Sequence, residues 1–139
     1  MEADERYERL WACLEALRLD NHDTLVLVEG VRDERALRQL GVTGKIHVYN
    51  TGRSLIATAE HLVRNHKRVI ALFDWDRTGG SLTRRLQEQL HAQVEIDLTY
   101  RKELAQVSQV RCVEDLPGAL RNWARRAGIT RDQTGDAEA

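Results

Sequence analysis

The sequence predicts an α/β fold, with a mostly parallel four-stranded sheet and helices on both faces. Two apolar runs, within 24–29 and 68–73, carry much of this prediction, because a strand buried on both faces reads as a continuous run of Val, Ile and Leu. Strand-like and helix-like segments also alternate through the middle of the chain, a pattern typical of βαβ units. The length of 139 residues suits one domain.

The first expected element is a helix over 4–19, where apolar residues recur on one face at helical spacing. The run at 24–29 follows as the first strand. Asp33 then lies near the start of a short helix, which we expect to end at Gly41 because glycine is favoured just past a helix C-terminus.

The middle of the chain repeats this alternation. Residues 45–49 form the second expected strand, and Asn50-Thr51-Gly52 predicts a turn. A helix over 53–65 follows, with its apolar residues on one face, and 68–73 is the third expected strand.

The last third is less regular. Gly79-Gly80-Ser81 is expected to open a helix, and 93–98 alternates as the fourth strand. Residues 100–106 fit one or two helical turns, and 107–113 fit a last short strand. Pro117 stands near the start of a final helix, a position where proline is tolerated.

These elements divide the chain into three parts. We expect a helical flank at 1–21, the α/β domain proper at 22–115, and a C-terminal helix with a frayed tail at 116–139.

Composition limits the classes of function. The formal net charge is −1, so no global basic field marks a polyanion-binding protein. Lys occurs only at 45, 67 and 102, and the remaining basic residues are Arg, which suits bidentate phosphate contacts, although a codon preference explains the same bias. Cys13 and Cys112 lack zinc-site spacing, and neither a secretory leader nor a membrane-spanning apolar run is present. We therefore expect a cytoplasmic protein with no membrane partner.

Carboxylates follow both apolar runs. Glu29 ends the first strand, and Asp74 and Asp76 follow the third. In an open α/β sheet, ligands bind beyond the carboxyl ends of the strands. Asp74 and Asp76 point the same way, because side chains alternate along extended backbone. Three carboxylates at one sheet edge predict a site for a hard divalent cation, Mg²⁺ or Mn²⁺.

The loop after Asp76 fits a phosphate group. Gly79 and Gly80 allow backbone to approach a ligand closely, and the amide groups at the start of the following helix favour an anion. Arg77 lies in the same loop. The alternative is an ordinary strand–helix turn, in which Asp76 only caps the helix.

Glu29 has two interpretations as well. Alone, it reads as a turn residue that faces solvent. Beside two other carboxylates its pKa should rise, while a bound cation would lower that pKa again. Such a balance can poise a carboxyl group for proton transfer near neutral pH.

These residues together resemble a Toprim domain, the fold of bacterial-type primases, topoisomerases, OLD-family nucleases, RecR proteins and ribonuclease M5. The family's strand ending in Glu-Gly matches Leu25-Val-Leu-Val-Glu29-Gly30. Its strand followed by Asp-x-Asp-x-x-Gly matches Leu72-Phe-Asp74-Trp-Asp76-Arg-Thr-Gly79. The resemblance spans 22–115, and Asn50-Thr51-Gly52 is most similar to the turn of the ribonuclease M5 group.

The resemblance implies a role for each matched residue. Glu29 would act as general acid or base, and Asp74 and Asp76 would hold Mg²⁺. Gly30 and Gly79 would shape the loops. The chain departs from many members in having Val-Arg, rather than an early Lys, after Glu-Gly.

Arginines supply the expected contacts to a nucleic-acid backbone. Arg77 and the amides of Gly79 and Gly80 would hold a phosphate oxygen. The further candidates, each of which could instead be part of a solvated helix face, are Arg32, Arg53, Arg84 and Arg85.

The implied function is Mg²⁺-dependent cleavage or transfer of phosphodiester bonds in nucleic acid. A topoisomerase needs a catalytic Tyr on another domain and a replicative primase needs further domains, and neither fits this length. Cleavage like that of ribonuclease M5 is therefore the nearest analogy, and primase-like chemistry on the same site stays open. The partner is RNA or DNA, with RNA favoured, and a protein partner or a homodimer is also expected.

Two other classes compete with this interpretation. A non-catalytic Toprim module could bind nucleic acid or protein within a larger complex. A haloacid-dehalogenase-type phosphatase also ends a strand in Asp-x-Asp, but its pair normally follows the first strand and precedes Gly-Thr or Gly-Val, unlike Arg77-Thr78 here. Trp75, between the two aspartates, is expected to pack rather than to offer a base-stacking surface.

Overall fold

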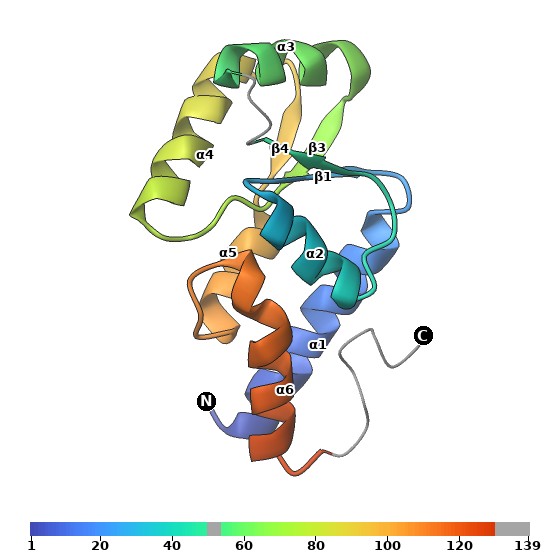
Figure 1. Ribbon diagram of the computed structural model, residues 1–139, viewed down its shortest axis with the longest axis vertical. Helices are drawn as coiled ribbons and strands as arrows, with labels where there is room; N and C mark the ends of the chain where they lie inside the picture. The colour runs from blue at the N-terminus through green and yellow to red at the C-terminus, as the bar shows by residue number, and fades with distance from the viewer. Residues whose placement is uncertain (50–53, 130–139) are drawn as a thin grey trace.

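The computed structural model describes residues 1–49 and 54–129. A four-stranded sheet carries helices on both faces (Figure 1), which confirms the predicted α/β fold. The strands are β1 (Leu25–Val28), β2 (Ile46–Val48), β3 (Arg68–Ala71) and β4 (Glu95–Asp97). The helices are α1 (Ala3–Asp20), α2 (Val31–Gln39), α3 (Leu55–Asn65), α4 (Arg77–Leu90), α5 (Thr99–Val107) and α6 (Leu116–Arg126), with a 3₁₀ turn η1 (Val113–Asp115).

The sheet brings the two acidic segments together. Its strand order is β2-β1-β3-β4 and every neighbouring pair is parallel. Val26 in β1 lies opposite Ile46 in β2 and Ile70 in β3. The carboxyl ends of all four strands therefore share one edge, and β1 and β3, which precede Glu29 and Asp74, are central neighbours.

Alternating strand residues build two separate cores. Val26 and Ile70 are fully buried against the layer formed by α1, α2, α5 and α6. Leu27 and Val69 are fully buried on the other face, against α3 and α4. Figure 1 shows α3 and α4 towards one end of the molecule and the larger helical layer towards the other. Such strands are apolar throughout because both of their faces are covered.

Local signals set several helix ends. The Ser54 hydroxyl accepts a hydrogen bond from the Ala57 amide (3.1 Å) and so caps α3. Pro117 stands in the first turn of α6, where its missing N–H costs little. Helix α4 begins at Arg77, two residues before the predicted glycines, because Asp76 provides the cap.

The predicted strand over 107–113 is wrong. Helix α5 extends to Val107, and it contains the whole segment 100–106. Gln109 then adopts a positive φ of 61°, which interrupts extended backbone. The carbonyl of Arg111 accepts the Trp75 amide (3.2 Å), so this loop braces the end of β3 without joining the sheet.

Some predictions fall outside the described residues. These are the turn at 50–52, the first expected residue of the third helix, Arg53, and the tail at 130–139. Within the described residues, no helix combines the length and the apolar character needed to cross a membrane.

Candidate active site

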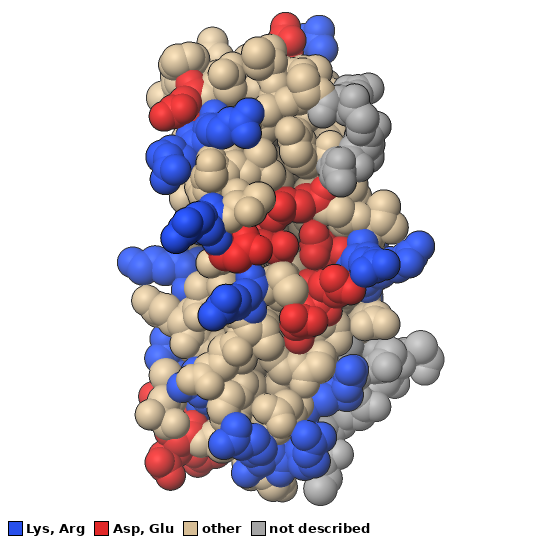
Figure 2. All heavy atoms as spheres, turned by 60° about the vertical axis from the view of Figure 1, so that its left-hand side comes forward, with Lys and Arg blue, Asp and Glu red and all other residues tan. Residues whose placement is uncertain are grey.

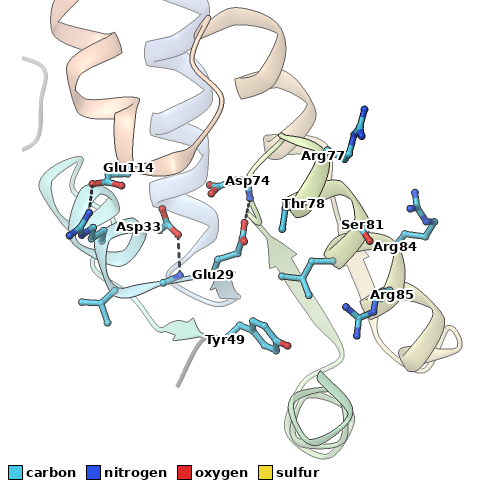
Figure 3. Close-up of a pocket in the computed structure, with 14 residues that line it drawn as sticks. Glu29, Asp33, Tyr49, Asp74, Arg77, Thr78, Ser81, Arg84, Arg85 and Glu114 are labelled. Atoms are coloured by element: carbon cyan, nitrogen blue, oxygen red, sulfur yellow. Dashed lines mark hydrogen bonds and ion pairs between the residues drawn. The ribbon is translucent and has the colours of Figure 1, made fainter. Parts of the chain in front are cut away.

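Glu29 and Asp74 meet at the carboxyl edge of the sheet (Figure 3). Glu29 Oε2 accepts a hydrogen bond from the Asp74 backbone amide at 2.7 Å. Asp74 Oδ1 in turn accepts the Val113 amide at 3.1 Å, from the turn η1. The contact follows from the pairing of β1 with β3, because Glu29 directly follows β1 and Asp74 lies three residues beyond the end of β3. The structure thus brings together two of the three predicted carboxylates.

Glu29 and Asp74 line a pocket of about 940 Å³. The lining comes from the segments that follow β1, β2 and β3, from the start of α2, from residues 77–85 of α4, and from η1. It includes four of the predicted arginines, Arg32, Arg77, Arg84 and Arg85. Ligands of an open α/β sheet are expected at this position.

Asp76 takes a different position. Its Oδ1 accepts the Gly79 amide at 2.7 Å and caps α4, as the alternative interpretation predicts, and its side chain is exposed. In the described part of the chain, no three His, Cys, Asp or Glu side chains already converge as a metal site. Only one oxygen of Asp76 is used by the cap, so the other oxygen faces no competing bond within the described residues.

Burial and mutual repulsion raise the pKa values of the site carboxyls. Burial raises the pKa of Glu29, the amide of Asp74 opposes this, and the charge of Asp74 raises the pKa further. Burial likewise raises the pKa of Asp74, the Val113 amide lowers it, and the charge of Asp76 raises it. The sequence-based expectation of a raised pKa at Glu29 is therefore confirmed, with burial rather than charge as its largest cause.

The donor set fits a hard divalent cation. Glu29 and Asp74 offer only oxygen, and no ion pair joins either carboxylate to a Lys or Arg among residues 1–49 and 54–129. A cation would relieve the repulsion that raises their pKa values. Mg²⁺ is usually bound by one or two carboxylates together with water and substrate phosphate, so the site needs no complete cage of protein ligands.

The glycines shape the loops, and their amides already donate hydrogen bonds within those loops. A Cβ atom on Gly79 would lie 1.8 Å from the Asp74 carbonyl oxygen, so only glycine fits there. The amides of Gly79 and Gly80 donate to Asp76, to its side chain and its carbonyl. Gly30 caps α2, and its amide donates to Asp33 Oδ2 at 3.0 Å. The predicted phosphate contact through Gly79 and Gly80 would therefore compete with bonds inside the loop.

Arginines stand on both sides of the acidic cluster. Figure 2 shows acidic side chains in the middle of this face with basic side chains flanking them. Arg77, Arg84 and Arg85 come from α4 and Arg32 comes from α2, all of them exposed. Arg32 lies 3.9 Å from Glu114. Arg53 lies outside the described residues.

Comparison with known proteins identifies the fold family. The family model for the Toprim domain matches residues 23–100. This chain belongs to the Toprim family.

The chain is also similar to relatives of comparable length. A UPF0292 protein of Pyrococcus furiosus is 34% identical over 131 residues, which cover 89% of this chain and 97% of the relative. A UPF0292 protein of Methanocaldococcus jannaschii is 36% identical over 107 residues, or 75% of this chain and 82% of the relative. The solved structure of a protein from Aquifex aeolicus matches with a TM-score of 0.66 and 23% identity, over 75% of this chain and 94% of that chain, which shows a shared fold.

Membership of the Toprim family ties this chain to nucleic-acid-related and divalent-metal chemistry in general terms. Helices α1 and α6 lie outside the family match, yet both pack in the same core as β1 and β3. The Toprim sheet and its flanking helices therefore share one apolar layer.

Sequence reasoning missed four residues of this Toprim site. Asp33 is buried against Gly30, and Glu114 lines the pocket. Arg101 donates to the Phe73 carbonyl (2.8 Å) and the Asp74 carbonyl (2.7 Å) and holds the end of β3. Tyr49 also lines the pocket. Of these four residues, only Tyr49 could have been predicted from the sequence, because it directly follows a strand at the ligand-binding edge.

Proposed function

We propose that this Toprim domain is a Mg²⁺-dependent enzyme that cleaves or transfers phosphodiester bonds in nucleic acid, with structured RNA preferred to DNA, in the cytoplasm. One observation carries the proposal. Glu29 and Asp74 meet through a 2.7 Å hydrogen bond in an open pocket whose rim holds exposed arginines. Repelling carboxylates beside cationic side chains suit a phosphodiester and a divalent cation together.

Glu29 is the proposed general acid or base. One of its oxygens is held by the Asp74 amide, which fixes the carboxyl group in the pocket. Its raised pKa, caused first by burial, keeps a larger protonated fraction near neutral pH than an ordinary Glu would have. Glu29 would therefore move a proton to or from the attacking or leaving oxygen.

Asp74 and Asp76 are the proposed holders of Mg²⁺, or of Mn²⁺ in its place. A bound ion would stabilise the charge that develops on the phosphodiester. Asp74 is fixed by the Val113 amide, and Asp76 stands at the cap of α4. Gly79 would keep the loop after β3 tight, because a Cβ atom there would lie 1.8 Å from the Asp74 carbonyl oxygen, and Gly30 would shape the loop after β1 at the cap of α2.

Arginines would bind the rest of the strand. Arg32 reaches the pocket from α2 and Arg77 from α4, and Arg84 lies about two helical turns along α4 from Arg77. Arg53 and the backbone at Gly80 are the other proposed contacts to the nucleic-acid backbone. Their guanidinium groups suit phosphate oxygens because they donate in pairs.

The test is a Mg²⁺-dependent cleavage assay on end-labelled structured RNA, single-stranded DNA and duplex DNA. We expect cleavage by the wild type, loss with chelator, and a fall of about 100-fold or more in Glu29→Gln and in Asp74→Asn. Both changes keep an oxygen that can accept the amide bond observed here, so the loop geometry should survive. Glu60→Gln, an exposed residue of α3, is the matched control and should cleave normally.

Calorimetry separates the two roles. Glu29→Gln should keep Mg²⁺ affinity while Asp74→Asn loses most of it. Loss of Mg²⁺ binding in Glu29→Gln would contradict its role as acid or base, and absence of cleavage on every substrate would contradict an enzyme that acts alone.

A specific observation also favours a second candidate, a non-catalytic binding module in a larger complex. Each of the three carboxylates accepts a backbone amide, and so each has a structural role without chemistry. In that case Asp74→Asn and chelator would leave nucleic-acid affinity unchanged. Sedimentation would then show whether the domain binds a protein partner or a second copy of itself.

A further inference from the structure

Tyr49 stands next to Glu29 at the edge of the sheet. The Tyr49 amide donates to the Val28 carbonyl at 2.9 Å, and Val28 and Val48 are register partners. Glu29 and Tyr49 therefore leave neighbouring parallel strands at the same level, where strands lie about 4.8 Å apart. Both side chains line the pocket, as Figure 3 shows.

The Tyr49 ring has a firm support. It meets the ring of Phe73 edge to face, with centroids 5.9 Å apart and an interplanar angle of 60°. Phe73 is fully buried in the core beneath α3 and α4. Tyr49 itself is half-buried, so part of its surface stays open to the pocket.

Cationic side chains face the same space from helix α4. Ser81 lines the pocket one turn along the helix from Arg77, and Arg84 and Arg85 line it about two turns along. No ion pair ties Arg77, Arg84 or Arg85 to a carboxylate within the described residues. Their guanidinium groups are thus available to an anionic ligand.

The other aromatic candidate is excluded by its packing. Trp75 is half-buried against the larger helical core, and its Nε1 donates to the Val110 carbonyl. The prediction that Trp75 packs is therefore confirmed. Tyr49 is left as the ring that lines this pocket from the neighbouring strand.

We propose that the pocket binds one unpaired nucleotide of a strand, with its base against the Tyr49 ring and its phosphate towards the arginines of α4. This inference rests on the proposed function, since it names the substrate class of that site. A flat ring beside guanidinium groups recognises a nucleotide because a base stacks on the ring while the phosphate binds the cations. Bases inside a duplex stack on one another and expose no free face, so the site selects an unpaired position.

The test compares binding to a labelled RNA hairpin with an unpaired loop and to a fully paired duplex of equal length. Anisotropy is measured with Mg²⁺ on a Glu29→Gln background, so that turnover does not disturb the signal. Tyr49→Leu should weaken hairpin binding about tenfold, as expected for one lost stacking contact, and leave duplex binding within about twofold. Tyr49→Phe, which keeps the ring, should bind like the parent protein.

A series of hairpins, each lacking one base of the loop, makes the test independent of the folding of any variant. With Tyr49 present, one abasic position should lose about tenfold in affinity. In the Tyr49→Leu variant, removal of the base at that position should cause no further loss of affinity. Equal losses at every position, or equal weakening of hairpin and duplex by Tyr49→Leu, would overturn the proposal.

Failure of this inference and failure of the proposed function give different results. Cleavage that depends on Glu29, without a stacking position, would leave the enzyme and remove the nucleotide subsite. A stacking position without any cleavage would leave a nucleotide-binding pocket and remove the catalytic role.

Discussion

Gly79 is the residue at which the loop after β3 has the least freedom. A Cβ atom there would lie 1.8 Å from the carbonyl oxygen of Asp74, and a backbone atom cannot move aside as a flexible side chain can. We expect Gly79→Ala to lower the free energy of unfolding by about 2 kcal/mol or more, as for an overpacked site. Urea unfolding followed by circular dichroism measures this loss.

Gly80 is the matched control for that change. A Cβ atom on Gly80 would have Arg101 Nη2 as its nearest neighbour, at 4.0 Å. Gly80→Ala should therefore be neutral, or stabilising by up to about 1 kcal/mol, because Ala favours a helix over Gly. Equal stability of the two variants would show that the loop tolerates a side chain at both positions.

The candidate site was only partly predictable at the level of single residues. The meeting of Glu29 with Asp74 follows from two apolar strands and the parallel sheet they imply. The contributions of Asp33 and Glu114 do not, because Asp33 reads as an ordinary helix-start residue and Glu114 follows no strand of the sheet. Their place in the pocket depends on how α2 and η1 pack, which no local pattern encodes.

Helix α4 depends on Asp76 for its start. The side chain accepts the Gly79 amide at 2.7 Å, which satisfies one of the amides left free at a helix N-terminus. We expect Asp76→Ala to lower the free energy of unfolding by about 1 kcal/mol. Thermal and urea unfolding in the absence of divalent ions isolate this structural effect.

Asp76→Ser separates capping from metal binding. Serine caps a helix about as well as aspartate, so this variant should unfold like the wild type without Mg²⁺. If Asp76 also holds the ion, Asp76→Ser should lose Mg²⁺ affinity in calorimetry despite its normal stability. Unchanged affinity would assign Asp76 to the cap alone.

At the level of elements, sequence patterns worked where burial is regular. All four strands were predicted. The central strands β1 and β3 were found because covered parallel strands are apolar throughout, and the outer strands β2 and β4 because strand-like and helix-like segments alternate along the chain. A strand was wrongly predicted over 107–113 because the valines of this segment resemble those of a strand. Its conformation depends instead on a distant contact, in which the Trp123 indole donates to the Ser108 carbonyl (3.0 Å), and on the positive φ of Gln109. These constraints come from residues distant in sequence or from backbone angles, which periodicity does not report.

Over the whole molecule, charged side chains repel one another at the carboxyl edge of the sheet and form ion pairs near the start of β3. Repelling carboxylates with raised pKa values gather at the carboxyl edge. Near the start of β3, Arg68 binds Asp20 of α1 (2.7 Å) and also Asp97 of β4. Tyr100 of α5 donates to the same Asp20 carboxylate at 2.7 Å. This network joins the flanking helix α1 to two strands, far along the chain from Asp20.

The network predicts an acid-dependent loss of stability. The hydrogen bonds from Arg68, opposed by partial burial, lower the pKa of Asp20 to about 2. A carboxyl group with a lowered pKa stabilises the fold above its ordinary pKa, and this stabilisation is lost as pH falls towards the folded value. Allowing for solvent screening at a partly exposed pair, Asp20 should contribute roughly 1–2 kcal/mol at neutral pH.

Urea unfolding of the wild type and Asp20→Asn between pH 7 and pH 2 measures that contribution. The variant should be less stable by roughly 1–2 kcal/mol at pH 7. The two curves should approach each other below about pH 4 and meet only near the folded pKa of about 2. The raised pKa values of Glu29 and Asp74 act in the opposite direction, since protonation relieves their repulsion as pH falls. The difference between the two proteins removes that shared effect. Asp23→Asn, an exposed neighbour, is the control and should follow the wild type. Parallel curves for the wild type and Asp20→Asn would show that the link between α1 and the sheet does not depend on the ionised carboxylate.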